Sequence, residues 1–185
     1  MSAFEYLSVL ISVIVGLSVS HLLTSAARLI QRRHRMRLYP PTLLWMATLF
    51  IVQIQIWWVA YQSRNAEEWS FFSFLGLLVI PVIGYLLCYV LVPDLEEAGI
   101  DMRESYHQNR AWFFGLVVTA FLVSFARDLA SGGIPLDPNT VFRVVFVALS
   151  LGAIVVRREW FHMANAVLAL VLFCAYVFVE FLRLR

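Results

Sequence analysis

The sequence predicts an all-α membrane protein: a polytopic helical bundle with six transmembrane helices, forming one membrane domain with no soluble domain. Three observations predict this class: 62% of the 185 residues are apolar, only 14% are charged, and the mean hydropathy is +0.81. Soluble domains are about 45–50% apolar and roughly 25% charged. This composition cannot supply a surface that faces water, so a soluble globular fold, a disordered chain and a disulfide scaffold are excluded.

The apolar runs place the expected spans. A helix needs roughly 20 apolar residues to cross a hydrocarbon core of about 30 Å, because each residue rises about 1.5 Å. The runs predict spans at 4–29, 42–61, 71–92, 111–126, 141–156 and 160–182. The charged stretch before residue 111 is expected to be a loop. The first run lacks a basic leading segment and is too long for a signal peptide, so we expect a retained helix.

Arginines in the short loops predict the orientation, because cytoplasmic loops carry an excess of positive charge. The first connection holds the densest cluster, which includes Arg32, Arg33, Arg35 and Arg37. Placing this loop in the cytoplasm puts both termini outside. Its arginines are expected to contact anionic lipid head groups.

The second cytoplasmic loop is acidic and is expected to lie beside the first. Its carboxylates are Asp94, Glu96, Glu97, Asp101 and Glu104. Opposite charge should draw the two loops together, and a protein partner could dock on them. Nucleic-acid binding is not expected, since a short basic cluster without aromatic stacking residues is a poor footprint.

Polar side chains at membrane depth are candidates for function, because the bilayer makes them costly. On the sixth span they share one face at helical spacing, which predicts that this face points into the bundle or an oligomer seam. The pathway or ligand candidates are His162, Asn165, Tyr176 and Glu180, with Thr48 and Gln55 on the second span and Thr119 on the fourth. Interhelical hydrogen bonding is the structural alternative. Glu180 is expected to pair with Arg143 or Arg127, which lie at similar depth.

Small residues recur at every fourth position of the first span. Ser8, Ser12, Gly16 and Ser20 follow the small-xxx-small pattern, which is typical of closely packed membrane helices. We expect a close helix contact here, within one subunit or between two. A pathway along this stripe is the alternative.

The sequence predicts no metal site and no cofactor. His21 and His162 are weak candidates for a metal or for the axial ligands of a haem, which would bridge two helices. Cys88 and Cys174 lack a CxxC spacing and are expected to be buried apolar groups. HExxH, GxSxG, GxGxxG and phosphate-loop motifs are absent from the sequence, so an enzyme of a familiar class is not expected.

Two stretches carry a resemblance to other proteins. The opening Glu-Tyr-Leu-Ser-Val-Leu-Ile-Ser from Glu5 to Ser12, followed by Gly16-Leu17, resembles a group of uncharacterised bacterial six-helix inner-membrane proteins. The run Trp-Phe-Phe-Gly-Leu from Trp112 to Leu116 is similar to that group as well. The resemblance implies residence in a bacterial inner membrane and six helices. It implies no activity and no site residues.

Three functions stay open at this point. The leading interpretation is a solute or ion permeation pathway or ligand site, in a homo-oligomer. The alternative is a membrane-embedded scaffold or sensor subunit that acts through a partner at its charged cytoplasmic loops. The third is a redox subunit that binds haem or quinone.

Overall fold

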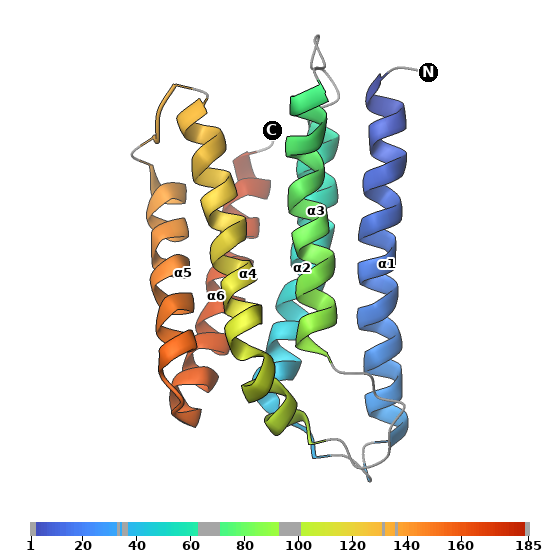
Figure 1. Cartoon of the computed structure of the whole chain (residues 1–185), viewed down its shortest axis with the longest axis vertical. Coiled ribbons are helices and arrows are strands. Elements are labelled where there is room, and N and C mark those ends of the chain that lie inside the picture. Colours follow the sequence, from blue (N-terminus) through green and yellow to red (C-terminus); the bar gives the residue numbers. More distant parts are fainter. Residues whose placement is uncertain are drawn as a thin grey trace.

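The computed structural model is an all-α bundle, which confirms the predicted fold class (Figure 1). It describes residues 3–32, 34, 37–62, 71–92, 101–130, 132–135 and 137–183; side chains are described within 5–32, 34, 37–61, 75–92, 101–130, 132–135 and 137–178. The helices are α1 (Ala3–Arg32), α2 (Pro40–Gln62), α3 (Phe71–Leu91), α4 (Met102–Ala130), α5 (Pro138–Val155) and α6 (Glu159–Arg183).

The six helices run antiparallel to their sequence neighbours, so the bundle has two distinct ends (Figure 1). We call the end where α1 begins and α6 ends the termini end. The opposite end, where α1 ends and α4 and α6 begin, is the basic end. Arginines cluster at the basic end, and they include Arg37, Arg103, Arg110, Arg157 and Arg158.

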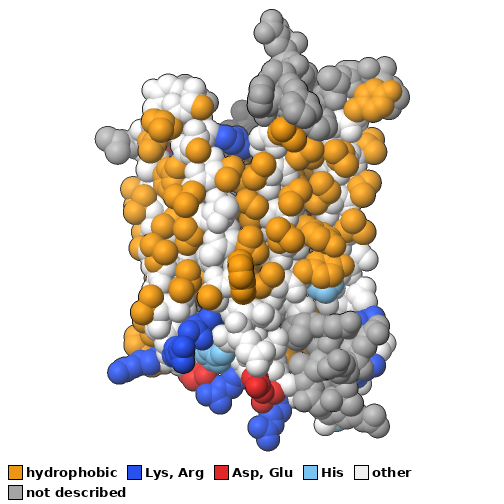
Figure 2. Space-filling model, viewed as in Figure 1, with side chains coloured by type: hydrophobic (Ala, Val, Ile, Leu, Met, Phe, Trp, Pro, Cys, Tyr) orange, Lys and Arg blue, Asp and Glu red, His pale blue; other side chains and the backbone are white. Residues whose placement is uncertain are grey.

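The outer surface of the bundle suits a hydrocarbon environment. Hydrophobic side chains cover the middle of the face seen in Figure 2, and charged side chains gather mainly at the basic end. Exposed apolar side chains include Trp112 at 74%, Leu129 at 68% and Val155 at 78%. Soluble proteins rarely expose such continuous apolar surface. Five of the helices are long and apolar enough to cross a membrane, and the apolar part of α3 with described side chains, Leu75–Leu91, is shorter.

The start of α4 differs from the expectation. Residues 102–110 were expected to lie in a loop, and the structure shows them as the first turns of a 29-residue helix. The carboxylate of Asp101 accepts hydrogen bonds from the backbone N–H groups of Arg103 at 2.9 Å and Glu104 at 3.4 Å. This cap satisfies donors that a helix start leaves open, so the helix begins before the apolar run.

The helices form two groups of three that share a core. α1 packs on α2 and α3, α5 packs on α4 and α6, and the contacts of α3 with α4 and of α2 with α6 join the groups. Side chains of α2 pack closely against α3 at Gly84. A Cβ atom placed on Gly84 would lie 2.8 Å from Nε2 of Gln53 and 3.1 Å from Cδ1 of Ile56. Only glycine leaves room for the buried Gln53 amide at this crossing.

The close within-chain packing predicted for the small-residue stripe of α1 is not found at Gly16, and the stripe contacts α2 only through Ser12, which accepts a hydrogen bond from the Trp57 indole within the described residues. Ser12, Gly16 and Ser20 are exposed, and a Cβ on Gly16 would meet no atom within 4 Å. The buried face of α1 instead carries larger apolar side chains: Leu7, Ile11, Val15, Leu22 and Leu29. These side chains bury more area against α2 and α3 than serines would, and this decides which face turns inward. A contact between two subunits stays a prediction.

Candidate functional site

The main candidate site is a cavity of about 320 Å³ lined by α2, α3, α4, α5 and α6. Most of its wall is apolar, and several polar side chains interrupt that wall toward the termini end. The polar lining residues are Thr48, Gln55, Ser124, Arg127, Asn139, Arg143 and Tyr176. Mostly apolar cavities with a few converging polar groups are typical of small-molecule sites.

Arg143 dominates the polar part of this cavity. It is only 5% exposed, and α5 carries it about 8 Å from its first residue. Its Nη1 donates to Asp128 at 2.6 Å and to Ser124 at 2.9 Å, and its Nη2 donates to Thr140 at 3.1 Å. Its Nε is buried and has no hydrogen-bond partner within the described residues. The guanidinium is therefore held by α4 and by Thr140 of α5, and its Nε–H is still open to an acceptor.

The N-terminus of α5 is built to place Arg143. Asp137 accepts a hydrogen bond from the backbone N–H of Thr140 at 2.7 Å, and Pro138 occupies the first turn. Proline is favourable there because the first helical residues need no N–H partner. The bond from Thr140 lowers the pKa of the Asp137 carboxyl, so the cap stays ionised at neutral pH.

Three aromatic rings close the cavity toward the basic end. Trp45 lines the cavity and is 3% exposed. Its ring makes edge contacts with Phe113 and Phe114, with centroids 5.1 Å and 5.6 Å away. Both phenylalanines are fully buried. We call these three residues the aromatic floor, and it separates the cavity from the polar groups below.

A polar layer lies beneath the aromatic floor and is centred on the Glu159 carboxylate. Tyr39 donates to Oε2 at 2.6 Å, Arg103 Nε donates to Oε1 at 2.8 Å, and His107 Nε2 lies 3.0 Å from Oε1. Burial and the bond to Glu159 raise the pKa of Tyr39 well above its usual range, so it stays a donor. One carboxylate thus ties α4 and the start of α2 to the start of α6.

His162 extends this layer inward and is fully buried. Its Nε2 lies 2.9 Å from the carbonyl of Val156, and its Nδ1 lies 3.1 Å from the Tyr106 hydroxyl. The carbonyl can only accept, so Nε2 carries the hydrogen and Nδ1 of the neutral ring accepts from Tyr106. Both ring nitrogens are therefore used in holding α6 to α4 and to the end of α5.

The described residues of the predicted polar face of α6 lie inward, but in two different environments. His162 and Asn165 are buried at 0% and 4% exposure, and they lie outside the cavity lining. Tyr176 lines the cavity, and its ring stacks on Phe142 with centroids 5.1 Å apart. Asn165 Nδ2 has no hydrogen-bond partner among the described residues.

Two further candidates line the same cavity as Tyr176, and a third does not. Thr48 and Gln55 of α2 line the cavity, as does Tyr176. Thr119 is exposed and donates to the carbonyl of Gly115 at 2.8 Å, and it does not line the cavity. Its inclusion in the pathway set was wrong, because this side of α4 turns away from the cavity.

The Glu180 side chain, for which an ion pair was expected, lies outside the described residues. Of its two expected partners, Arg143 is paired with Asp128 instead, at 2.6 Å. Arg127 lines the cavity close by. Asp128 follows the expected span 111–126, so the sequence analysis did not name it as a partner.

The basic and acidic connections meet where the structure describes both. Arg37 and Asp101 form a backbone bridge, and Nη1 of Arg37 lies 4.0 Å from Oδ2 of Asp101. The Arg37 side chain is 88% exposed, so this pair contributes little stability. Other residues of this prediction lie outside the described residues: Arg33, Arg35, Asp94, Glu96 and Glu97.

The histidines named as weak metal or haem candidates do not form a pair. His21 stacks on Tyr89 of α3 with ring centroids 3.9 Å apart, whereas His162 is bonded to α4. Within the described residues, no group of three or more His, Cys, Asp or Glu side chains could hold a metal ion. Cys88 is buried as expected, and Cys174 is exposed on the surface of α6.

Sequence reasoning missed the polar layer and the buried amide of Gln53. The layer draws on residues that the sequence seemed to place in loops: Tyr39, Arg103, Tyr106, His107 and Glu159. One signal could have found part of it. The pattern Asp101-x-x-Glu104 resembles a capping box, and it would have started the helix early enough to align Arg103, Tyr106 and His107. No spacing signal distinguished the buried Gln53 from Gln55.

Comparisons with protein-family models, with curated proteins and with solved structures give no match to this chain. The class of this protein is therefore defined by its fold and its cavity. The class is an all-α helical bundle with a mostly apolar cavity between its helices. The long apolar helices are compatible with an integral membrane protein.

Proposed function

We propose that this chain is an integral membrane protein that binds an amphipathic ligand with an anionic head in the cavity between α2 and α6. The single observation that carries the proposal is the polarity of that cavity. Arg127 and Arg143 lie at its termini end, and aliphatic and aromatic side chains form the rest of its wall. The head of an anion with an apolar tail would match the arginines, and its tail would match the apolar wall.

The Arg143 environment supports an anionic head. Asp128 accepts from only one side of the Arg143 guanidinium, at Nη1. The buried Nε–H of Arg143 is one open donor, and Asn139 and Gln55 add amide groups to the same wall. Hydrogen bonds from a guanidinium to a carboxylate or phosphate are about twice as strong as neutral ones.

The aromatic floor favours a ligand site over an open channel. A continuous pathway would have to pass Trp45, Phe113 and Phe114, then the bonded polar layer around Glu159. Passage of a solute would require these rings to separate. In the proposed topology, which keeps the sequence-based orientation, the cavity is reached from outside a bacterial inner membrane.

Photolabelling of the protein in phosphatidylcholine nanodiscs tests the proposal. The probe is a palmitate that carries a diazirine on its chain, and mass spectrometry locates the labelled residues. We expect labels on the cavity-lining parts of α2, α4 and α5, and loss of most labelling in Ala120→Phe, which fills the cavity. Ala148→Phe is the matched control, because Ala148 is an exposed alanine on α5.

The variant Arg127→Gln tests the contribution of the ligand head group separately from that of its tail. It should weaken labelling by the palmitate probe and leave labelling by the corresponding neutral alcohol unchanged. Equal labelling of the wild-type protein and Ala120→Phe would overturn the proposal. Steady chloride conductance of the wild-type protein in liposomes would indicate that the cavity belongs to a channel and not to a ligand site.

A further inference from the structure

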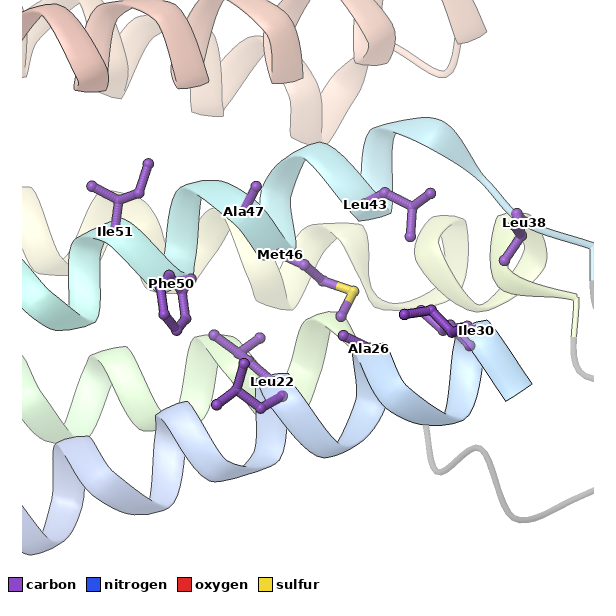
Figure 3. Close-up of a pocket in the computed structure, with 11 residues that line it drawn as sticks. Leu22, Ala26, Ile30, Leu38, Leu43, Met46, Ala47, Phe50 and Ile51 are labelled. Carbon is purple, nitrogen blue, oxygen red and sulfur yellow. The ribbon is translucent and has the colours of Figure 1, made fainter. Parts of the chain in front are cut away.

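A second hollow lies on the outside of the bundle, between α1 and α2 at the basic end (Figure 3). Its volume is about 620 Å³, and it is lined only by apolar residues: Leu22, Leu23, Ala26, Leu29, Ile30, Leu38, Leu43, Met46, Ala47, Phe50 and Ile51. We call it the α1–α2 groove. Leu22, Leu29 and Met46 are buried at its base, while Leu23 and Ile30 are more than half exposed.

The groove has the depth of one membrane leaflet. Leu22 and Ile30 bound it on α1, and Leu43 and Ile51 bound it on α2. On each helix, the distance along the axis between the two bounding residues is about 12 Å at 1.5 Å per residue. Half of a hydrocarbon core is about 15 Å thick. The groove thus extends from the basic end nearly to the middle of a bilayer.

The groove does not continue toward the termini end. There the two helices close on each other, because Ile11 and Val15 of α1 share a buried cluster with Ile56 and Ala60 of α2. Trp57 also donates from its indole N–H to the Ser12 hydroxyl at 3.1 Å. A transmembrane helix of a second subunit would need a groove across both leaflets, whereas an acyl chain needs only one.

Arginines flank the open end of the groove at the basic end. Arg32 follows Ile30 by two residues on α1, and Arg37 directly precedes Leu38. The Arg37 side chain is 88% exposed, and its contact with Asp101 is long at 4.0 Å. An anionic head group at this level would lie near Arg32 and Arg37 while its tail lay in the groove.

From these observations we infer that the α1–α2 groove is a binding site for one anionic phospholipid of the leaflet at the basic end. One acyl chain fills the apolar groove, and the phosphate lies between Arg32 and Arg37. Each arginine near such a head group contributes about 1 kcal/mol. Loss of both is therefore expected to weaken anionic binding about 30-fold, which is about 2 kcal/mol at 1.4 kcal/mol per tenfold.

Native mass spectrometry of lipids retained by the purified protein tests this site. The protein is exchanged into detergent with equal amounts of phosphatidylglycerol and phosphatidylcholine, and bound copies are counted per chain. We expect one retained phosphatidylglycerol. Arg32→Gln with Arg37→Gln should lose it, whereas Arg157→Gln with Arg158→Gln, exposed at the same end, should keep it.

A second pair of variants tests the acyl part. Ala47→Phe fills the groove and should reduce retention of both lipids, while Ala164→Phe, an exposed alanine of α6, should not. Thermal unfolding verifies that each variant is folded. Equal retention of the two lipids by the wild-type protein, or unchanged retention in Ala47→Phe, would overturn the inference. A dimer that Ala47→Phe dissociates would assign the groove to a second copy of the chain. Ala120→Phe, which tests the internal cavity, should leave lipid retention intact, so the two proposals fail separately.

Discussion

Gly84→Ala is the substitution whose effect the structure determines most directly. The new Cβ would lie 2.8 Å from Nε2 of Gln53, closer than side chains tolerate. Gln53 is fully buried, and its Nε2 donates to Sγ of Cys88 at 3.5 Å, so a shift of the amide would disturb this bond and the surrounding packing. Overpacking of this kind costs about 1–3 kcal/mol.

Controls separate this cost from the general effect of alanine in a helix. Replacing glycine by alanine stabilises a helix by roughly 1 kcal/mol. Gly76→Ala and Gly115→Ala should show that gain alone, since a Cβ at either position meets nothing within 4 Å. Gly84→Ala should therefore be about 1–3 kcal/mol less stable than either control. For a chain of this size that difference lowers Tm by about 2–4 °C per kcal/mol.

Thermal unfolding in detergent, followed by tryptophan fluorescence, measures these differences. A double-mutant cycle with Gln53→Ala then assigns the cause. The cost of Gly84→Ala should largely disappear once the Gln53 amide is removed, which gives a coupling energy of about 1 kcal/mol or more. The reasoning is refuted if Gly84→Ala melts together with Gly76→Ala, or if its cost persists without the Gln53 side chain.

Three further predictions use the same melting assay. Gly16→Leu should not lower Tm, because its surroundings are open and leucine is a better helix former than glycine; a change in mass by light scattering would show that the stripe joins two subunits. Asp128→Asn should lower stability by about 1.5–3 kcal/mol, since Arg143 loses its charged partner, and an unchanged Tm would disprove the importance of this pair. Asp137→Ala should lower Tm at pH 7, because it removes the bond to the Thr140 N–H. The folded pKa of Asp137 lies below its usual 3.8, so the wild type loses this stabilisation as pH falls through the folded pKa, and the difference between the two proteins should shrink in acid. A difference that grows in acid would contradict the assigned cause.

The candidate site could be predicted only in part. Helical spacing correctly placed His162 and Asn165 on an inward face, because the period of a helix is fixed whatever packs against it. It could not show that Tyr176 and His162, which share this face, lie in different environments. Tyr176 reaches the cavity while His162 is held by Tyr106, and this division depends on where α4 and α5 cross α6.

The sequence alone determined that this is a bundle of apolar helices. Hydrophobic composition and the length of apolar runs are local properties, and each helix satisfies its own backbone hydrogen bonds. The tertiary structure decided which face of each helix is buried. On α1, aliphatic residues such as Ile11 turned inward and the small-residue stripe around Gly16 turned outward. Both faces are compatible with a membrane helix, so only contact with α2 and α3 could select between them. Arg143 likewise met Asp128, because ion pairs depend on the distance between helices and not on spacing within one.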